Sequence, residues 1–418
     1  MKQHKHIAIS DKALCSGCSA CSAVCPKACI AMCEDAMGSK YPVVDNATCI
    51  QCGACVRTCP FLNPAIELAP NKCFAAVNSD ESVRLKSSSG GVFHALAQSV
   101  VYSGGIVVGA IFCKDWMVEH ISVESMNGVA RMMGSKYTQS DTLATFAETQ
   151  KHLLSGRTVL YTGTPCQIAG LNHFLRKDFS NLITVEVICH GAPERGVWRD
   201  YLKEFIARPT GERVGKNTVL SPPLKEQDVV IDNITFRDKR NGWKKYGFAL
   251  LPASAYGGRE NTVLPYAIFY EPFYDNAYMR AFLRNYSLRP SCYSCRTKSG
   301  RSHADLTIGD FWGIERTDII PDDDKCVSAV VCRSNKGLAV LRQCVGVELV
   351  ECSYADILKF NPSMESSVSH TDNARLFHKL FPKQGFHKTL HSIEHPAMFR
   401  RVKLSLKYRI SRILKFNR

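Results

Sequence analysis

Two short cysteine-rich segments carry the most specific chemistry in this chain. They read CSGCSACSAVCP at residues 15–26 and CIQCGACVRTCP at residues 49–60. Each has the spacing Cys-x2-Cys-x2-Cys-x3-Cys-Pro, in which the first three thiolates can surround one iron–sulfur cluster. The fourth cysteine cannot reach its own triplet's cluster without strain, so it binds the other cluster. The pair of segments therefore predicts two 4Fe–4S clusters that exchange their fourth ligands.

The exchange fixes the predicted ligand sets. The first cluster takes Cys15, Cys18, Cys21 and Cys59, and the second takes Cys49, Cys52, Cys55 and Cys25. Gly17 and Gly53 allow backbone N–H groups to approach the cluster sulfurs. The alternatives are a zinc site or a disulfide knot, but zinc sites usually use paired Cys-x2-Cys arms rather than tandem triplets that end in Cys-Pro.

Four further cysteines are candidates for a third cluster. Cys166 and Cys189 each follow a strand-like apolar run, where open α/β sheets build their sites, and Cys292 and Cys295 form a Cys-x2-Cys pair. Four thiolates from three segments can close another 4Fe–4S site. The alternative is two free core cysteines beside a small zinc or redox pair.

The other eight cysteines are expected to pack as small hydrophobic side chains. They are Cys29, Cys33, Cys73, Cys113, Cys326, Cys332, Cys344 and Cys352. Cys29 and Cys33 continue the spacing of four from Cys21 and Cys25, which predicts that they lie on one helix face as spectators.

The elements that must position these residues indicate a multi-domain protein of mixed α+β and α/β class. Its 418 residues exceed one typical domain. We expect a ferredoxin-type domain at residues 1–70, followed by units at 71–152 and 153–385 and a basic amphipathic helix at 386–418. Strands are predicted near residues 74–77, 104–112, 117–125, 157–163 and 181–188, and helices start near residue 91 and cover 140–154. Residues 215–290 are expected to be more irregular.

Composition places the chain in a reducing compartment and favours acidic partners. Twenty cysteines without a secretion signal predict a cytoplasmic protein. The formal charge is +15, and three clusters with four thiolates each would leave about +9. A ferredoxin or another acidic redox protein is the expected partner, whereas no motif accompanies the charge that would indicate nucleic acid. The basic C-terminal helix could contact an anionic membrane surface, at the inner face of the membrane, or could equally be a solvated tail.

Two polar loops are candidates for binding a cofactor. The segment SSSGGVF precedes a predicted helix, and GSKYTQS is a loop rich in donors. The candidate residues are Ser87, Ser88, Ser89, Gly90, Gly91, Lys136, Tyr137, Gln139 and Ser140. An ordinary helix cap and a solvated loop would have similar sequences. No dinucleotide-binding glycine motif or phosphate-binding loop is present.

Seven motifs together resemble the beta-subunit family of coenzyme F-420 hydrogenase/dehydrogenase, in a bacterial form with an N-terminal ferredoxin domain. The motifs are SSSGGVF, GSKYTQS, TGTPCQIAGL, CHGAP, FRDKRNGW, RPSCYSC and ADLTIGDFWGI, and they span residues 70–335 in the family's order. The resemblance implies that Cys166, Cys189, Cys292 and Cys295 bind a cluster and that FAD lies near the first two motifs. Relatives exchange electrons with a deazaflavin or, in other cases, reduce chlorophyll-type pigments.

Family resemblance does not fix the substrate. Many hosts of the fused bacterial form are not expected to make the deazaflavin, and such members resemble accessory proteins of surface-polysaccharide synthesis. We therefore expect a ferredoxin-linked flavin reductase acting on a small organic acceptor, either coenzyme F-420-like or another compound, with Lys136 or His190 holding a proton or an anion. The alternatives are an electron-transfer subunit without a substrate site and a membrane-surface scaffold with structural clusters. The sequence does not name the acceptor or the direction of electron flow.

Overall fold

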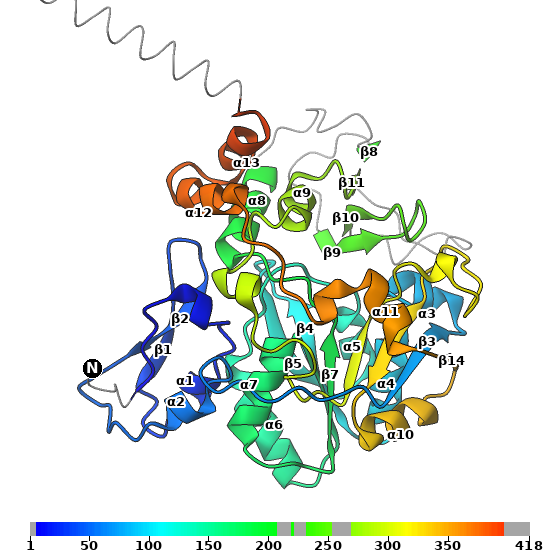
Figure 1. Ribbon diagram of the computed structural model, residues 1–418, viewed down its shortest axis with the longest axis horizontal. Coiled ribbons are helices and arrows are strands. Elements are labelled where there is room, and N and C mark those ends of the chain that lie inside the picture. The colour runs from blue at the N-terminus through cyan, green and yellow to red at the C-terminus, as the bar shows by residue number, and fades with distance from the viewer. Residues whose placement is uncertain (1–5, 207–218, 221–230, 253–268, 397–418) are drawn as a thin grey trace, which may run out of the picture.

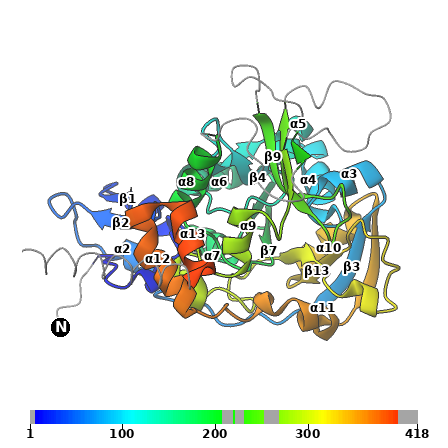
Figure 2. The same cartoon turned by 90° about the horizontal axis from the view of Figure 1, so that it is seen from above.

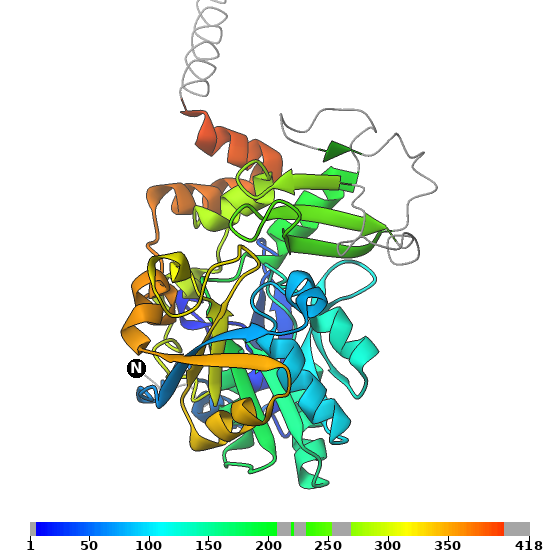
Figure 3. The ribbon, with the colours of Figure 1, turned by 90° about the vertical axis from the view of Figure 1, so that its right-hand side faces the viewer.

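The computed structural model describes residues 6–206, 219–220, 231–252 and 269–396. A small N-terminal unit lies beside a large mixed sheet, and a smaller sheet with its own helices lies above that sheet (Figures 1 and 3). The predicted C-terminal helix is described only as far as α13 (Phe386–Glu394), and its continuation at 397–418 falls outside the described residues. Within the described part of the chain, every helix is too short or too polar to cross a bilayer.

The N-terminal unit is the expected ferredoxin-like domain. Strands β1 (Ile30–Glu34) and β2 (Lys40–Val44) pair antiparallel. Two single-turn helices, α1 (Ala20–Ala23) and α2 (Ala54–Thr58), each contain the third cysteine of a triplet. Its core consists of a few apolar side chains and the cysteines themselves. Domains this small rarely bury enough apolar surface on their own, so this unit depends on whatever the cysteines bind and on the large domain beside it.

The large domain is built on an eight-stranded mixed sheet. Its central strands are parallel and its outer pairs are antiparallel. In spatial order the strands are β14 (Val347–Cys352), β3 (Lys72–Asn78), β13 (Ser328–Cys332), β12 (Leu306–Asp310), β7 (Leu182–Val187), β6 (Val159–Gly163), β4 (Ile106–Phe112) and β5 (Val118–Val123). Strands from residues 71–152 alternate in this sheet with strands from 153–385, so the two expected units share one sheet.

Alternation of apolar side chains along the strands explains why both faces are covered. In β4, Ile106 and Val108 point to one face and Val107 to the other, and all three are completely buried. One face carries α4 (Val92–Tyr102), α5 (Met126–Met132) and α10 (Asn335–Gln343). The opposite face carries α6 (Leu143–Leu154), α7 (Pro165–Leu175) and α11 (Tyr354–Phe360). The short α3 (Glu81–Lys86) follows β3.

The upper part of the molecule has a separate, aromatic core. A four-stranded antiparallel sheet replaces the irregular structure that we expected for residues 215–290, because β-branched and aromatic residues alternate there. It contains β8 (Val219–Leu220), β11 (Phe269–Pro272), β10 (Gly247–Pro252) and β9 (Ile231–Asp238). The helices α8 (Arg195–Ile206), α9 (Ala277–Leu283), α12 (Asp372–Gln384) and α13 pack around Trp198, Phe236 and Tyr278. Seen from above, α12 and α13 lie close to the N-terminal unit (Figure 2).

Candidate iron–sulfur and cofactor sites

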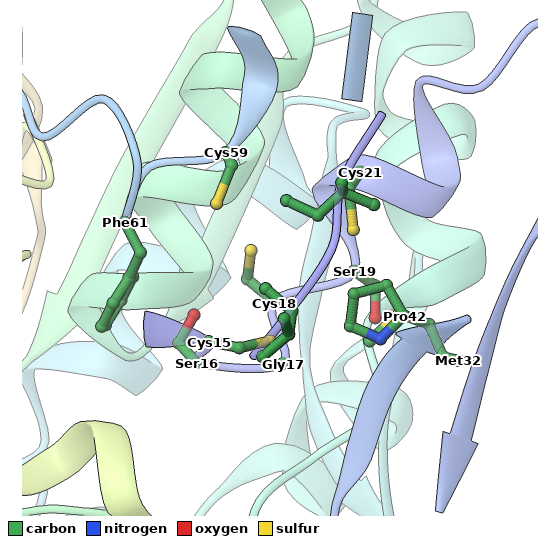
Figure 4. A pocket seen from close by; sticks show the side chains of 12 residues that line it. Cys15, Ser16, Gly17, Cys18, Ser19, Cys21, Met32, Pro42, Cys59 and Phe61 are labelled. Atoms are coloured by element: carbon green, nitrogen blue, oxygen red, sulfur yellow. The ribbon is translucent and has the colours of Figure 1, made fainter. Parts of the chain in front are cut away.

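The N-terminal unit contains two hollows, each lined by four of the predicted cluster cysteines. Cys15, Cys18, Cys21 and Cys59 line the first, with their sulfurs turned toward a common space (Figure 4). Cys49, Cys52, Cys55 and Cys25 line the second. The structure thus brings together both predicted sets, including the exchanged fourth cysteine of each segment. The first hollow lies on the side of the large domain and is called the inner site below, and the second is called the outer site.

Local backbone geometry explains how each triplet wraps around its hollow. Gly17 and Gly53 both have φ of +69°, a left-handed conformation that glycine adopts without a Cβ clash. Gly53 directly precedes α2, and Ser19, at φ of +65°, takes the same place before α1. The turn in front of each short helix therefore directs backbone N–H groups and thiols into the hollow.

One expectation about neighbouring cysteines is wrong. Cys29 and Cys33 do not lie on a helix, because Pro26 follows Cys25 and prevents α1 from continuing. Cys29 precedes β1 and its sulfur lies 3.4 Å from that of Cys25, at the edge of the outer site. Cys33 lies within β1 and is exposed, so it is not a packing residue.

The four remaining candidates form a third cysteine group, made of Cys166, Cys189, Cys292 and Cys295. Cys166 lies in the first turn of α7, Cys189 follows β7, and the other two lie in and directly after the 3-10 helix η3 (Pro290–Ser294). All four thiols interact electrostatically with one another. Their convergence depends on the parallel pairing of β6 and β7, which places both strand ends at one edge of the sheet.

The thiols of the third group are suited to a cluster and unsuited to redox exchange. Burial raises the pKa of Cys166 to about 11 and that of Cys189 to about 12, and it raises the pKa of Cys292 well above the usual value of a thiol. Thiols with such pKa values are poor nucleophiles. A bound metal centre supplies the positive charge that deprotonates coordinating thiols. Among the described residues, no three Cys, His, Asp or Glu side chains close around a single metal ion.

The inner site and the third group are in direct contact. Ser16, between two inner-site cysteines, hydrogen-bonds to Cys166. Helix α7 passes the inner site at Gly170, where an added Cβ would lie 3.0 Å from the Cβ of Cys18. Cys18 and Cys166 also interact electrostatically. The helix that carries one cysteine of the third group thus packs against the wall of the inner site.

Most polar groups of the SSSGGVF segment that could bind a ligand already make hydrogen bonds within the protein. The hydroxyl of Ser87 donates to the Val83 carbonyl, and that of Ser89 donates to the Gly309 carbonyl. A Cβ on Gly90 would lie 2.5 Å from the Ala76 carbonyl oxygen, so this glycine permits close packing of the segment against β3. Gly91 has φ of +91° and precedes α4.

Ser88 connects the first polar loop to the second. Its hydroxyl accepts a hydrogen bond of 2.6 Å from the backbone N–H of Ser135. The two loops that the sequence singled out therefore meet in space, although 47 residues separate their contact points.

The second loop has structural partners at each of the four predicted positions. Lys136 donates to four carbonyls at the end of α5, and burial lowers its pKa to about 7. The ring of Tyr137 packs against Phe282 at 4.7 Å between centroids. Gln139 donates to the Ser16 carbonyl at 2.7 Å, and the Ser140 hydroxyl is bonded to His120. Lys136 is thus committed to capping a helix, and Gln139 joins the loop to the inner site.

A group of residues that the sequence did not single out lies where the family motifs meet. Arg237 is buried, forms an ion pair of 2.7 Å with Asp310 at the end of β12, and donates to the Tyr137 hydroxyl at 3.2 Å. Its guanidinium lies 4.0 Å from the ring centroid of Tyr246. The sequence pointed to Arg237 only as part of the family motif FRDKRNGW. We call Arg237, Asp310, Tyr246, Trp243 and Trp312 the arginine–aromatic cluster.

Three buried donors of this cluster make no hydrogen bond among the described residues: Nε and Nη2 of Arg237 and the indole Nε1 of Trp243. Nη2 is the atom that forms the ion pair with Asp310, so within this part of the chain Nε and the indole N–H lack any acceptor. Trp243 is fully buried and stacks on Trp312 with 4.4 Å between ring centroids. Buried polar groups are nearly always satisfied in native proteins. Unpaired donors beside flat aromatic rings fit a planar ligand that carries acceptor atoms, as an isoalloxazine ring does.

His190 lies between the third cysteine group and this cluster. Its Nε2 donates to Asn285 at 2.5 Å, and its ring meets Phe282 edge-on at 5.3 Å. Phe282 in turn packs against Tyr137, whose hydroxyl contacts Arg237. Burial lowers the pKa of His190, so the imidazole is neutral near pH 7. A continuous run of packed rings therefore leads from Cys189 to the arginine–aromatic cluster.

Glu194 gives the contact between the two domains a pH dependence. Its Oε2 accepts a hydrogen bond from Ser39 of the N-terminal unit, and its Oε1 lacks a partner within the described part of the chain. Burial raises its pKa to about 8, although Arg289 opposes the shift. Since the unfolded chain releases this proton near pH 4.5, the folded state binds the extra proton between pH 4.5 and 8.

Stability is therefore expected to fall as pH rises through this window, by up to about 1.4 kcal/mol per pH unit. Glu194→Gln should flatten this fall when thermal unfolding of the anaerobic holoprotein is followed between pH 6 and pH 8. The exposed Glu124 pairs with Arg157, and Glu124→Gln should leave the slope unchanged. An equally steep slope in Glu194→Gln would contradict the assignment.

Comparisons with known proteins match both parts of the chain. Residues 156–356 match the family described as the C terminus of the coenzyme F420 hydrogenase/dehydrogenase beta subunit, and residues 14–63 match the 4Fe–4S dicluster domain. A chain in a structure of the F420-reducing [NiFe] hydrogenase complex from Methanosarcina barkeri is similar at 15% identity and a TM-score of 0.43, covering 74% of this chain and 92% of that one. No curated protein matches the chain. The two family matches contain all twelve cysteines of the three groups.

Proposed function

The chain joins a 4Fe–4S dicluster domain to a C-terminal domain of the coenzyme F420 hydrogenase/dehydrogenase beta-subunit family. We propose that the protein is an iron–sulfur flavoprotein oxidoreductase. It passes electrons between a ferredoxin-type donor and an organic acceptor through three 4Fe–4S clusters and FAD. The observation that carries the proposal is the order in which the sites adjoin. Cys55 of the outer site interacts electrostatically with Cys21 and Cys59 of the inner site. The inner site contacts the third cysteine group, and the packed rings lead from there to the arginine–aromatic cluster.

The outer site faces the donor. Cys52 is exposed, and Ile50 beside it is 58% exposed, whereas Cys15 and Cys18 of the inner site are buried. Arg57 is exposed and donates to the Cys52 carbonyl, which places a cation at the rim. An acidic one-electron carrier suits this surface, because opposite charges steer association.

The two ferredoxin-type sites and the third group would hold the clusters through their twelve thiolates, and the clusters would carry single electrons. The cysteines fit that role because the inner and outer groups each line a hollow and lie in the dicluster domain. The four thiols of the third group lie close enough to interact electrostatically with one another. Ser16 and α7 keep the inner site and the third group in contact.

FAD would lie at the arginine–aromatic cluster and convert between one-electron and two-electron chemistry. Arg237 and Trp243 would donate their unpaired N–H groups to it, and Tyr246 and Trp312 would pack against its ring. Asp310 holds the guanidinium in place. Ser88 contacts the loop around Tyr137, which reaches Arg237, and both would lie beside the FAD. The two predicted acid–base groups would have structural roles here. Lys136 would hold the carbonyls at the end of α5, and His190 would belong to the run of packed rings.

The acceptor is a small organic molecule, either a deazaflavin of the coenzyme F-420 type or another compound, such as an intermediate of surface-polysaccharide synthesis. A second function is a non-catalytic subunit that feeds electrons to a partner oxidoreductase. The internal bonds of Ser87, Ser89 and Lys136 favour that reading, since they leave fewer polar groups for a substrate. Membrane contact through residues 386–418 stays a prediction.

Cofactor analysis of anaerobically purified protein tests the proposal. About twelve irons, about twelve acid-labile sulfides and one FAD per chain are expected, with the flavin bleached by reduced ferredoxin. About eight irons without flavin would overturn it in favour of the non-catalytic electron carrier.

A further inference from the structure

Arg289 joins the inner site to the third cysteine group. It precedes Cys292 by three residues, in the segment RPSCYSC of the large domain, and the Cys292 N–H donates to its carbonyl. Its side chain crosses into the N-terminal unit and is 1% exposed. One residue therefore contacts a cysteine of each group, once through its backbone and once through its side chain.

All three nitrogens of the guanidinium donate hydrogen bonds, and an aromatic ring packs against it. Nε donates to the Cys15 carbonyl at 2.9 Å, and Nη2 donates to the Lys40 carbonyl at 2.8 Å. Nη1 donates to Gln139 at 3.0 Å, and the Tyr41 ring lies 4.2 Å from the guanidinium carbon. Nη2 also lies 3.8 Å from the Cys15 sulfur. These contacts hold the positive charge directly against a thiol of the inner site.

Arg289 forms no ion pair within 4 Å among the described residues, and the Glu194 carboxyl, with which it interacts electrostatically, keeps its proton near pH 7 because its pKa is about 8. The acceptors of the guanidinium are carbonyls, an amide and a sulfur. A buried cation without a counterion is costly, whereas an iron–sulfur cluster held by four thiolates carries net negative charge in either oxidation state. The site thus lacks the compensating charge that a cluster at Cys15 would bring.

We propose that Arg289 raises the reduction potential of the inner cluster relative to the outer one. This inference rests on the proposed function, in which both sites hold clusters. A nearby cation favours the more negative, reduced form of a cluster, and hydrogen bonds to ligand sulfurs act in the same direction. Electrons arriving at the outer site then collect at the inner cluster, beside the third group. Arg289 is a positioning residue in this role.

Arg296 provides a matched control. It also reaches from the large domain to the N-terminal unit, where its Nη1 donates to the Phe61 carbonyl at 2.8 Å. Phe61 lines the inner site, but among the described residues Arg296 makes no hydrogen bond to a cluster cysteine of that unit. If Arg289 only held the domains together, Arg289→Gln and Arg296→Gln would have the same effect.

Redox titration of the anaerobic holoprotein, followed by electron paramagnetic resonance, tests the inference. The signals are assigned with Cys52→Ser, which alters the outer cluster. Arg289→Gln should disfavour reduction of the inner cluster by about tenfold, a shift of about 59 mV for one electron, and leave the outer midpoint unchanged. Arg289→Lys should give a smaller shift in the same direction, because its ammonium cannot bond Cys15 and Lys40 together. Arg296→Gln should shift neither.

An unchanged inner midpoint in Arg289→Gln, or an equal shift in Arg296→Gln, would overturn the inference. Where Arg289→Gln loses iron, Arg289→Lys decides: a downward shift confined to the inner cluster supports the role, and no shift rejects it. The iron content of the unmodified protein keeps this test separate from that of the proposed function. If the unmodified protein binds fewer than eight irons, the proposed clusters themselves fail.

Discussion

Replacing Cys292 with alanine is expected to lower the iron content from about twelve to about eight atoms per chain and to abolish reduction of the flavin by reduced ferredoxin. The Cys292 thiol interacts electrostatically with the other three thiols of the third group, and the N–H of Ala192 donates to its sulfur at 3.4 Å. Without this thiol, the third cluster would be lost, and it is the proposed electron carrier between the inner site and the arginine–aromatic cluster. The two clusters of the N-terminal unit should remain.

Iron analysis and stopped-flow absorption of the flavin measure this effect. Cys344→Ala is a suitable control, since Cys344 is a buried thiol whose hydrogen bond goes to the Val340 carbonyl and which belongs to none of the three groups. Full iron content and normal flavin reduction in Cys292→Ala would reject the third cluster. Loss of iron in both variants would indicate general destabilisation instead.

Arg237→Lys is expected to weaken FAD binding by about 10- to 100-fold without loss of iron. Lysine keeps a positive charge opposite Asp310 but removes the Nε donor, which has no acceptor among the described residues. A hydrogen bond to a charged group contributes about 1.5–3 kcal/mol, which sets the expected range. The ion pair itself should survive, so the fold around β12 should be retained.

Titration of FAD into protein stripped of flavin, followed by fluorescence, gives the dissociation constant. Arg240 offers the control: it lies in the same motif, is partly exposed and pairs with Asp238. Arg240→Lys should leave FAD affinity within a few-fold of that of the unmodified protein. An unaltered dissociation constant in Arg237→Lys would place the flavin elsewhere in the chain.

Local sequence was sufficient for the elements that carry their own signal. Cysteine spacing grouped eight residues into two sets, and the structure brings each set around one hollow, because ligands only a few residues apart leave the chain few ways to fold. Apolar runs rich in Val and Ile located β3, β4, β5, β6 and β7. The prediction that a helix continues through Cys29 was wrong because Pro26 prevents α1 from extending. A spacing of four residues contains no information about this proline.

Only the tertiary structure decided the order of the strands and which distant residues are in contact. Strand order places β3 between β13 and β14, so segments that the sequence separated at residue 152 share one sheet. The ion pair of Arg237 with Asp310 spans 73 positions, and Arg289 reaches Cys15 across 274. Such contacts leave no periodic trace in the chain, since they depend on how sheets and helices pack. The sequence determined which cysteines have the spacing of cluster ligands, and the packing of α7 and η3 against the N-terminal unit decided that the inner site and the third cysteine group lie in contact.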